Sequence, residues 1–293
     1  MGARVNLGRV GIWSRELRFG DPGLAVEAAA ELETLGFGTL WVPDLGGPVF
    51  EAVERLLEAT QHAVVATGIL NVWMHAAADV AAAQDELEKR FPGRFLLGLG
   101  IGHASLVDDG HPGRYARPLT TMRSYLDAID AAAATPHPRV LAALAPKMLA
   151  LAAERASGAH PYLVPVEHTR VVRATLGASA LLAQELSVVL GPDVEECRGL
   201  ARRDLAGYLT LPNYTNTWRR LGYSDADLAR GGSDRLVDAL YALGTPSLVA
   251  ERIAEYRNAG ADHVCLRVVV EDPLGSEELP LDAWRALGSL TSA

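Results

Sequence analysis

Two histidines and an aspartate stand where short apolar runs of the sequence end, and such side chains could exchange a proton with a ligand. His103 follows FLLGLGIG, His168 follows PYLVPVE, and Asp44 ends FGTLWVPD. Histidine changes its charge near neutral pH, which suits it to donate or accept a proton there. We therefore predict His103 and His168 as catalytic residues, with Glu167 raising the pKa of His168. A structural role is the alternative for His103, and Glu167 could instead point away from His168.

Other residues after apolar runs could hold a flat or charged ligand. Trp13 and Trp73 offer aromatic faces that could wall a substrate pocket for a ring system or simply plug it. An unpaired carboxylate is costly to bury, so Asp44 should accept hydrogen bonds from a ligand or the backbone, or else cap the next helix. GLGIGH, residues 98–103, would let a planar cofactor or its phosphate approach the backbone closely.

Pro146 and Lys147 follow Ala145 directly after another apolar run, and a proline at this place favours the start of a helix. Free N–H groups, the helix dipole and one lysine would converge there on an anion. A phosphate site is therefore predicted at this helix start.

All these residues follow predicted strands, which alternate with alanine-rich helical stretches. Repeated βα units predict an α/β fold with a parallel sheet, and eight strands predict a closed (β/α)8 TIM barrel. Because such barrels work at the C-terminal ends of their strands, the residues named above should share one mouth. The predicted strands span residues 7–13, 37–43, 63–72, 95–101, 139–144, 161–164, 185–190 and 262–268.

One domain is expected over residues 1–293, since no Pro-rich or Gly/Ser-rich linker divides the chain. The pattern breaks at residues 209–232, which we interpret as an insertion before the last βα unit, serving as a lid or as an oligomer contact. Gly36, Gly158 and Gly260 each stand between a helix and an apolar run, which predicts left-handed helix ends.

Composition excludes several classes of protein. The 293 residues are 49% hydrophobic without a run of about 18 apolar residues, so no membrane span is expected. The N-terminus lacks an export signal, which favours a cytoplasmic protein. A net charge of -9 argues against nucleic acid or an anionic membrane as partner. Cys197 and Cys265 are too few for a disulfide framework and are predicted in the core, and no histidine spacing suggests a metal.

Taken together, these runs resemble the luciferase-like monooxygenase superfamily, specifically its coenzyme F420-dependent oxidoreductases of mycobacterial type. The resemblance covers nearly the whole chain and is fairly specific in the order and spacing of its segments. They are GFGTLWVPD (36–44), VATGILNVWMHAAADVAAA (65–83), FLLGLGIGH (95–103), PRVLAALAP (138–146) and AERASGAHPYL (153–163).

The resemblance implies a place for each part of the cofactor. The deazaflavin ring would lie across a bulge in the third strand with a non-proline cis peptide, which falls at Gly68–Ile69. The members that oxidise sugar phosphates or alcohols carry a catalytic histidine where this chain has Leu45, so those substrates are not expected. The ring would be surrounded by Asp44, Asn71, Gly100, Gly102 and His103, and the phosphate-bearing tail would be lined by Ala142, Ala143, Ala145 and Pro146.

Three functions follow as hypotheses. The leading one is hydride transfer between the 5-deazaflavin of coenzyme F420 and a small organic substrate. The second is an FMN-dependent monooxygenase that receives reduced flavin from a partner reductase, since the same barrel serves both cofactors. The third is a non-catalytic ligand-binding barrel. Alanine-rich helices could also pack against a second subunit as a homodimer.

Overall fold

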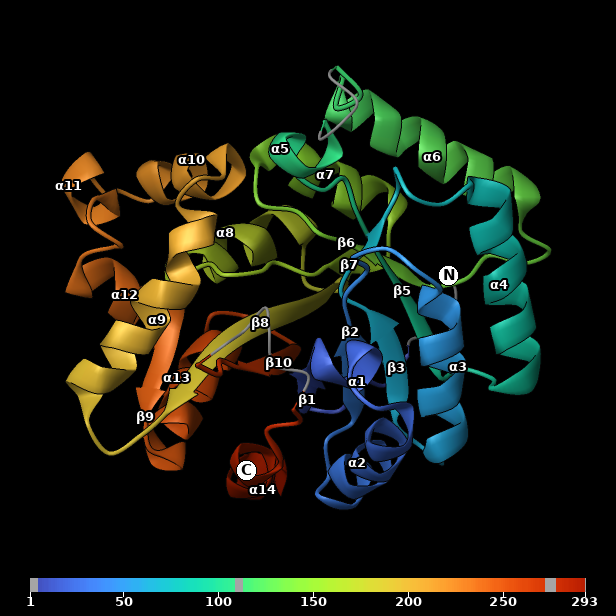
Figure 1. The fold of residues 1–293 in the computed structure, drawn as a ribbon. Helices are drawn as coiled ribbons and strands as arrows, with labels where there is room; N and C mark the ends of the chain where they lie inside the picture. Colours follow the sequence, from blue (N-terminus) through green and yellow to red (C-terminus); the bar gives the residue numbers. More distant parts are fainter. Residues whose placement is uncertain (1–4, 109–112, 272–277, 293) are drawn as a thin grey trace.

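The computed structural model describes residues 5–108, 113–271 and 278–292 (Figure 1). Its strands are β1 (Val10–Trp13), β2 (Thr39–Val42), β3 (Val64–Thr67), β4 (Leu70–Asn71), β5 (Phe95–Gly100), β6 (Arg139–Leu141), β7 (Gly158–Ala159), β8 (Leu181–Leu190), β9 (Tyr241–Gly244) and β10 (His263–Val268). Every pairing between them is parallel, in the order β10-β1-β2-β3-β5-β6-β7-β8. Because β10 also pairs with β8, the sheet closes, and the predicted (β/α)8 barrel is confirmed.

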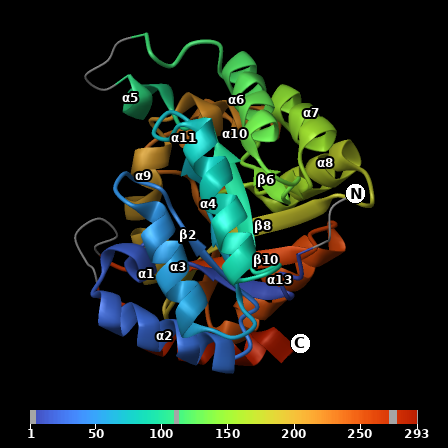
Figure 2. The ribbon, with the colours of Figure 1, turned by 90° about the vertical axis from the view of Figure 1, so that its right-hand side faces the viewer.

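Helices surround the closed sheet (Figure 2). They are α1 (Glu16–Phe19), α2 (Pro22–Thr34), α3 (Val49–Ala59), α4 (Ala77–Arg90), α5 (Ala104–Val107), α6 (Pro118–Ala132), α7 (Pro146–Arg155), α8 (Val166–Leu176), α9 (Val194–Tyr208), α10 (Pro212–Arg220), α11 (Asp225–Leu228), α12 (Asp234–Leu240), α13 (Pro246–Asn258) and α14 (Leu281–Leu287). Among the described residues, no helix is long and apolar enough to cross a membrane.

The strands bury residues on both of their faces, which is why they appear in the sequence as unbroken apolar runs. In β2, Leu40 and Val42 pack with the helices in the large outer core, whereas Trp41 belongs to a smaller cluster. Both cysteines are free and buried, as predicted: Cys265 shares the cluster of Trp41, and Cys197 lies in α9 within a second buried cluster.

Two histidines are buried beside Trp41 and stay uncharged. The indole stacks on His160 with ring centroids 4.2 Å apart, and its Nε1 donates to Nε2 of His263 at 3.2 Å. Since Nε2 accepts, His263 carries its proton on Nδ1 and donates it to the carbonyl of Gly8 at 3.0 Å. Burial lowers the pKa of both histidines to about 4.

The sixth strand differs from its prediction. Residues 161–164 are not extended into the sheet; the pairing strand β7 is Gly158–Ala159 instead. Gly158 is therefore not a left-handed helix end, unlike Gly36 and Gly260, whose φ angles are 89° and 110°. A Cβ at Gly158 would lie 1.8 Å from the carbonyl oxygen of Leu181, so glycine is needed for the close approach of β7 and β8.

The insertion is longer and more helical than the break at residues 209–232 predicted. Helices α10 and α11 lie within that range, but the whole excursion between β8 and β10 also includes α9, α12, α13 and the unpredicted strand β9 (Figure 1). Strand β9 pairs with the end of β8, from Ser187 to Leu190, beyond most of the contact with β10. Only four residues long and directly following a helix, β9 gives no separate apolar run in the sequence.

The buried histidines make the fold sensitive to acid. An unfolded chain protonates them near their ordinary pKa of 6.5, whereas the folded chain does so only near 4. Hence the unfolded state binds more protons in this window, and the free energy of unfolding falls as the pH drops from 6.5 to 4, by roughly 3 kcal/mol per histidine.

Urea unfolding followed by circular dichroism at several pH values measures this loss. In His160→Gln, the amide can still donate to a carbonyl but does not titrate. The loss in the free energy of unfolding should therefore be smaller by roughly 3 kcal/mol, the contribution of one histidine. An unchanged dependence on pH in that variant would show that His160 does not titrate as described.

Candidate functional site

The strands bring most of the predicted site residues to one end of the barrel. Trp13, Asn71 and Gly100 are the last residues of β1, β4 and β5, and Asp44 follows β2 by two positions. The loop of Ala142 and its neighbours follows β6. Parallel strands align their carboxyl ends, so these residues surround one mouth.

The bulge between β3 and β4 forms one wall of this mouth. Its peptide bond Gly68–Ile69 is cis, as the resemblance implied. Trp13 lies against it, and its Nε1 donates to the carbonyl of Gly68 at 2.7 Å. A Cβ at Gly100 would lie 2.2 Å from Cδ1 of Ile69, so the side chain of Ile69 occupies the space that this glycine leaves. The indole and the glycine thus fix the shape of the bulge.

Asp44 has protein donors for both of its carboxylate oxygens, although its side chain is fully buried. Oδ2 accepts from the backbone N–H of Asn71 at 3.0 Å and lies 2.8 Å from Nε2 of His75. Oδ1 accepts from the N–H of Gly46 at 3.2 Å and from Arg18 at 3.4 Å. Asp44 does not cap α3, whose N-cap residue is Pro48. It acts instead as a support that ties the end of β4 to the loop after β2.

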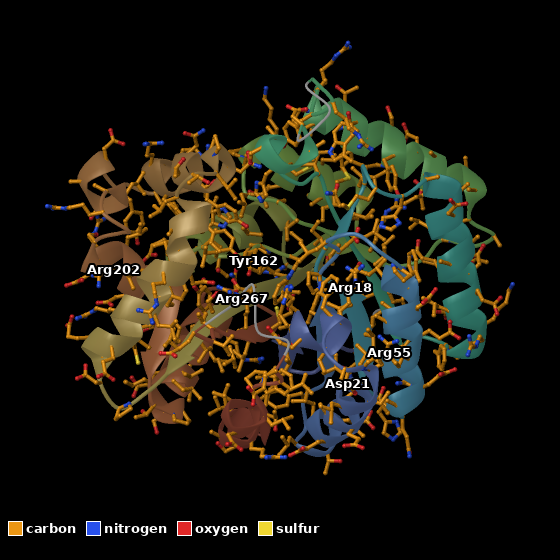
Figure 3. All side chains as sticks on the ribbon, viewed as in Figure 1. Arg18, Asp21, Arg55, Tyr162, Arg202 and Arg267 are labelled. Carbon is orange, nitrogen blue, oxygen red and sulfur yellow. The ribbon has the colours of Figure 1, made fainter. Side chains whose placement is uncertain are left out.

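Arg18 belongs to this support and was not predicted. Its guanidinium, in α1, donates to the carbonyl oxygens of Pro43 and Gly46 besides approaching Asp44 (Figure 3). The side chain is only 3% exposed, so its charge needs partners inside the protein. The carboxylate of Asp44 and the two carbonyl groups are these partners. The sequence places Arg18 five residues after β1, where nothing marks it as buried.

His103 is half-buried at the start of α5 and contacts the insertion. Nδ2 of Asn213, in α10, lies 3.5 Å from the carbonyl oxygen of Gly102 and 3.2 Å from Nδ1 of His103. Because the carbonyl can only accept, the amide nitrogen is the donor, and Nδ1 of His103 is the acceptor. The ring proton is then on Nε2. Burial lowers the pKa of His103, so the ring is neutral near pH 7.

His168 is placed differently from its prediction. It is buried in the first turn of α8, where Nε2 donates to the carbonyl of Leu144 at 3.0 Å. Glu167 is exposed and lines a recess of about 350 Å³ with Arg170 and Arg252, away from the mouth. Burial lowers the pKa of His168, so the expected rise caused by Glu167 is wrong. Successive residues of a helix point in different directions, which separates this pair.

The predicted phosphate loop has an exposed helix start. Helix α7 begins at Pro146, as expected, and Ala145, Pro146 and Lys147 are all exposed. Ala142 donates its N–H to the carbonyl of Leu99, and the side chain of Ala143 is buried. Next to this loop, Nδ1 of His168 is buried without a hydrogen-bond partner among the described residues.

Five aromatic rings cross the mouth, and we call them the aromatic belt: Trp13, Tyr162, Tyr208, Tyr214 and His103. Their successive centroids are 5.7, 5.9, 5.2 and 5.4 Å apart. Two rings come from the insertion, at the end of α9 and in α10, so at least part of the insertion covers the mouth. The hydroxyl groups of Tyr162 and Tyr208 are 3.1 Å apart, and burial raises the pKa of both.

A buried ionic cluster fixes the insertion to the barrel. Arg267, in β10, forms two hydrogen bonds with the carboxylate of Asp204 in α9, at 2.5 and 2.9 Å, and lies 3.6 Å from Glu185 in β8. Burial alone would raise the pKa of Asp204, but the guanidinium lowers it, whereas burial keeps the pKa of Glu185 raised. Figure 3 shows Arg267 beside Tyr162, whose ring centroid is 5.7 Å from the guanidinium carbon.

This cluster was not predicted, although the sequence holds a signal for it. Glu185 and Arg267 stand inside two runs that were predicted as strands. A charge within a buried strand needs a partner of opposite sign, which could have paired the two residues. Asp204 offered no such signal, because it lies on a helix with charged neighbours.

Comparisons with known proteins agree with this architecture. A family model described as luciferase-like monooxygenase matches residues 9–263. A Mycobacterium tuberculosis protein named as a coenzyme F420-dependent oxidoreductase is 24% identical over 240 residues. That alignment covers 80% of this chain and 64% of the relative, so the chain spans less than two thirds of its length.

Solved structures share the fold at low identity. A coenzyme F420-dependent tetrahydromethanopterin reductase from Methanopyrus kandleri has a TM-score of 0.73, with 98% of each chain covered. An F420-dependent secondary alcohol dehydrogenase has a TM-score of 0.68, with 97% of this chain and 98% of that one covered. The oxygenating part of 3,6-diketocamphane monooxygenase from Pseudomonas putida, bound to FMN, has 0.69 and 97% of each chain. Each is 14% identical to this chain.

Removing the cation from the buried cluster should destabilise the protein strongly. In Arg267→Met, Asp204 would remain buried without its partner, at a cost of about 3–5 kcal/mol in the free energy of unfolding. Denaturant unfolding measures this cost. The double variant Arg267→Met with Asp204→Leu should recover part of it, because the carboxylate of Asp204 is removed together with its cation, whereas Glu185 still lacks Arg267. Equal losses in the single and double variants would contradict the pairing.

Proposed function

Because the chain belongs to the luciferase-like monooxygenase family, we propose that this enzyme transfers hydride between the deazaflavin of coenzyme F420 and a small organic substrate. The observation that carries the proposal is His103, a neutral ring held by Asn213 at the mouth with its proton on Nε2. The M. tuberculosis relative, by its name, favours F420 over FMN.

The residues around the mouth fit a ring cofactor that carries a phosphate. Ala145, Pro146 and Lys147 expose the start of α7, where N–H groups and one ammonium group can bind an anion. Nδ1 of His168 is buried beside this loop without a partner among the described residues. Because Nε2 carries the ring proton, Nδ1 is an acceptor, which a hydroxyl group of a bound ligand could satisfy but a phosphate oxygen could not. The bulge at Gly68 and Ile69, together with Asn71 and Gly102, would contact the ring.

The residues of the mouth have three tasks in this reaction. The deazaflavin supplies or receives the hydride when it is bound. Asp44 holds Asn71 at its place, so the bulge is rigid beneath the ring. The aromatic belt excludes water, which strengthens hydrogen bonds inside the mouth. His103 donates its Nε2 hydrogen bond to a substrate oxygen on which negative charge develops, as a neutral imidazole can.

Parallel fluorescence titrations of oxidised coenzyme F420 and of FMN test the cofactor. We expect saturable binding of F420 and much weaker binding of FMN. Tighter binding of FMN would favour a monooxygenase that uses reduced flavin instead. If neither binds, the barrel binds other small molecules without this chemistry, and the proposal fails.

Substitutions of His103 test its role in turnover. With a substrate found by screening, His103→Ala should lower kcat by about 100-fold, the usual effect of losing one such donor. His103→Gln should retain much of the activity, because the amide can still donate. Affinity for F420 should change little in either variant. Equal loss in the two variants would indicate proton transfer rather than hydrogen bonding.

The dependence on pH gives a second readout. Since burial lowers the pKa of His103 below its ordinary value of 6.5, most of the rings are neutral at pH 7 and above, and kcat should change little between pH 7 and pH 8. Asn213→Ala frees Nδ1, so the ring can carry its proton on either nitrogen, and kcat should fall several-fold while the affinity for F420 is kept. If kcat of Asn213→Ala equals that of the unmodified enzyme, Asn213 does not position His103.

A further inference from the structure

A groove of about 520 Å³ lies beside the mouth, between the loop after β4 and the first turns of α6. Helices α4 and α6 lie side by side beneath it (Figure 2). The predictions from sequence included only one of its residues, Trp73. The groove is lined by Trp73, Arg114, Ala116, Arg117, Thr120, Thr121, Ser124, Tyr125 and Ala128.

Trp73 connects the groove to the mouth. Its Nε1 donates to the carbonyl of Ile101, just after β5, and its backbone N–H donates to the side chain of Asn71. On the other side, Arg114 donates to the carbonyl of Trp73 at 2.5 Å. The indole therefore separates the cofactor end of the barrel from the groove, and a ligand in the groove would lie next to the reacting centre.

Two arginines give the groove a positive charge. Arg114 and Arg117 are both exposed, and neither has a carboxylate within 4 Å among the described residues. Arg123, in α6 but outside the groove, is paired with Glu154 by two hydrogen bonds of 2.7 and 2.8 Å. Thr120 and Ser124 add exposed hydroxyl groups. In a chain of net charge -9, the groove therefore carries a local positive charge.

We propose that the groove binds the anionic end of a ligand, a carboxylate or phosphate between Arg114 and Arg117, with an apolar part of the ligand on the face of Trp73. The carboxylate or phosphate could belong to either of two ligands. One is the oligoglutamate tail of the cofactor, and this source rests on the proposed function. The other is an organic acid that is the substrate. Because both arginines are exposed, each contributes little, and binding should weaken with salt.

The variant Arg114→Gln with Arg117→Gln removes both charges of the groove. Because Arg114 also donates to the carbonyl of Trp73, uncharged titrants report any effect of the variant on the mouth. Its matched control is Arg203→Gln with Arg230→Gln, which removes two exposed arginines elsewhere. Arg230 is also left-handed, with φ of 53° against 45° for Arg117, so the control reproduces the backbone conformation. Circular dichroism establishes that both variants are folded.

Four titrants separate the two sources. Coenzyme F420 with its oligoglutamate tail is compared, by fluorescence, with the same deazaflavin chromophore lacking phosphate and glutamates. By calorimetry, 2-naphthoate is compared with the uncharged 2-naphthylmethanol. We expect the groove variant to bind an anionic titrant about 3- to 10-fold more weakly at low salt, whereas the control and the uncharged titrants are unchanged.

Each outcome decides a different point. Weaker binding of F420 alone assigns the groove to the cofactor tail, and weaker binding of 2-naphthoate alone assigns it to an acidic substrate. If neither deazaflavin binds but 2-naphthoate depends on the arginines, the groove is supported and the proposed function fails. If F420 binds equally well to both variants and 2-naphthoate shows no dependence on the arginines, the groove proposal is overturned while the proposed function stands.

Discussion

A buried carboxylate without access to water is stable only if groups of the protein donate hydrogen bonds to it. The donors that Asp44 requires determine the arrangement of the loops at the mouth of the barrel. Its two oxygens bind the backbone of Asn71 and of Gly46, together with the side chains of His75 and Arg18. These groups come from separate loops, so satisfying one charge fixes the bulge, the loop after β2 and the short helix α1 together. Trp73 follows Asn71 by two residues, and its backbone N–H donates to the side-chain oxygen of Asn71.

The insertion depends on a second buried charge. Arg267 in the last strand binds Asp204, and this pair holds α9 against the barrel. From the end of α9 the chain continues into α10, which carries Tyr214 and Asn213 over the mouth to His103. The tautomer of His103 is thus set by helix α10, which follows α9, and the ion pair between α9 and β10 keeps that part of the insertion in place.

The barrel could be predicted because buried parallel strands appear in the sequence as apolar runs that alternate with helices. The bulge at residues 68–70 could be placed because it lies within the segment 65–83, which resembles the family over its whole length. Spatial relations between side chains could not be predicted in the same way. Glu167 and His168 are adjacent in sequence but point to opposite environments, because a helix begins there. Gly158 suits a helix end equally well in sequence, and only the carbonyl of Leu181 shows that it allows two strands to meet.

Charge is divided between the mouth and the groove, and burial explains why. Inside the mouth, Asp44, Asp204 and Arg267 are buried and already bound to partners, so a ligand there meets aromatic faces and the neutral ring of His103. An unpaired arginine could not be kept at such a place without a large desolvation cost. An anion would therefore be recognised at exposed positions, such as the start of α7 and the groove, where water compensates Arg114 and Arg117 until a ligand arrives. A ligand that reaches from the groove past Trp73 into the mouth can then bind the arginines through its anionic end. Its reacting carbon then lies in the mouth, whose surroundings favour neutral groups.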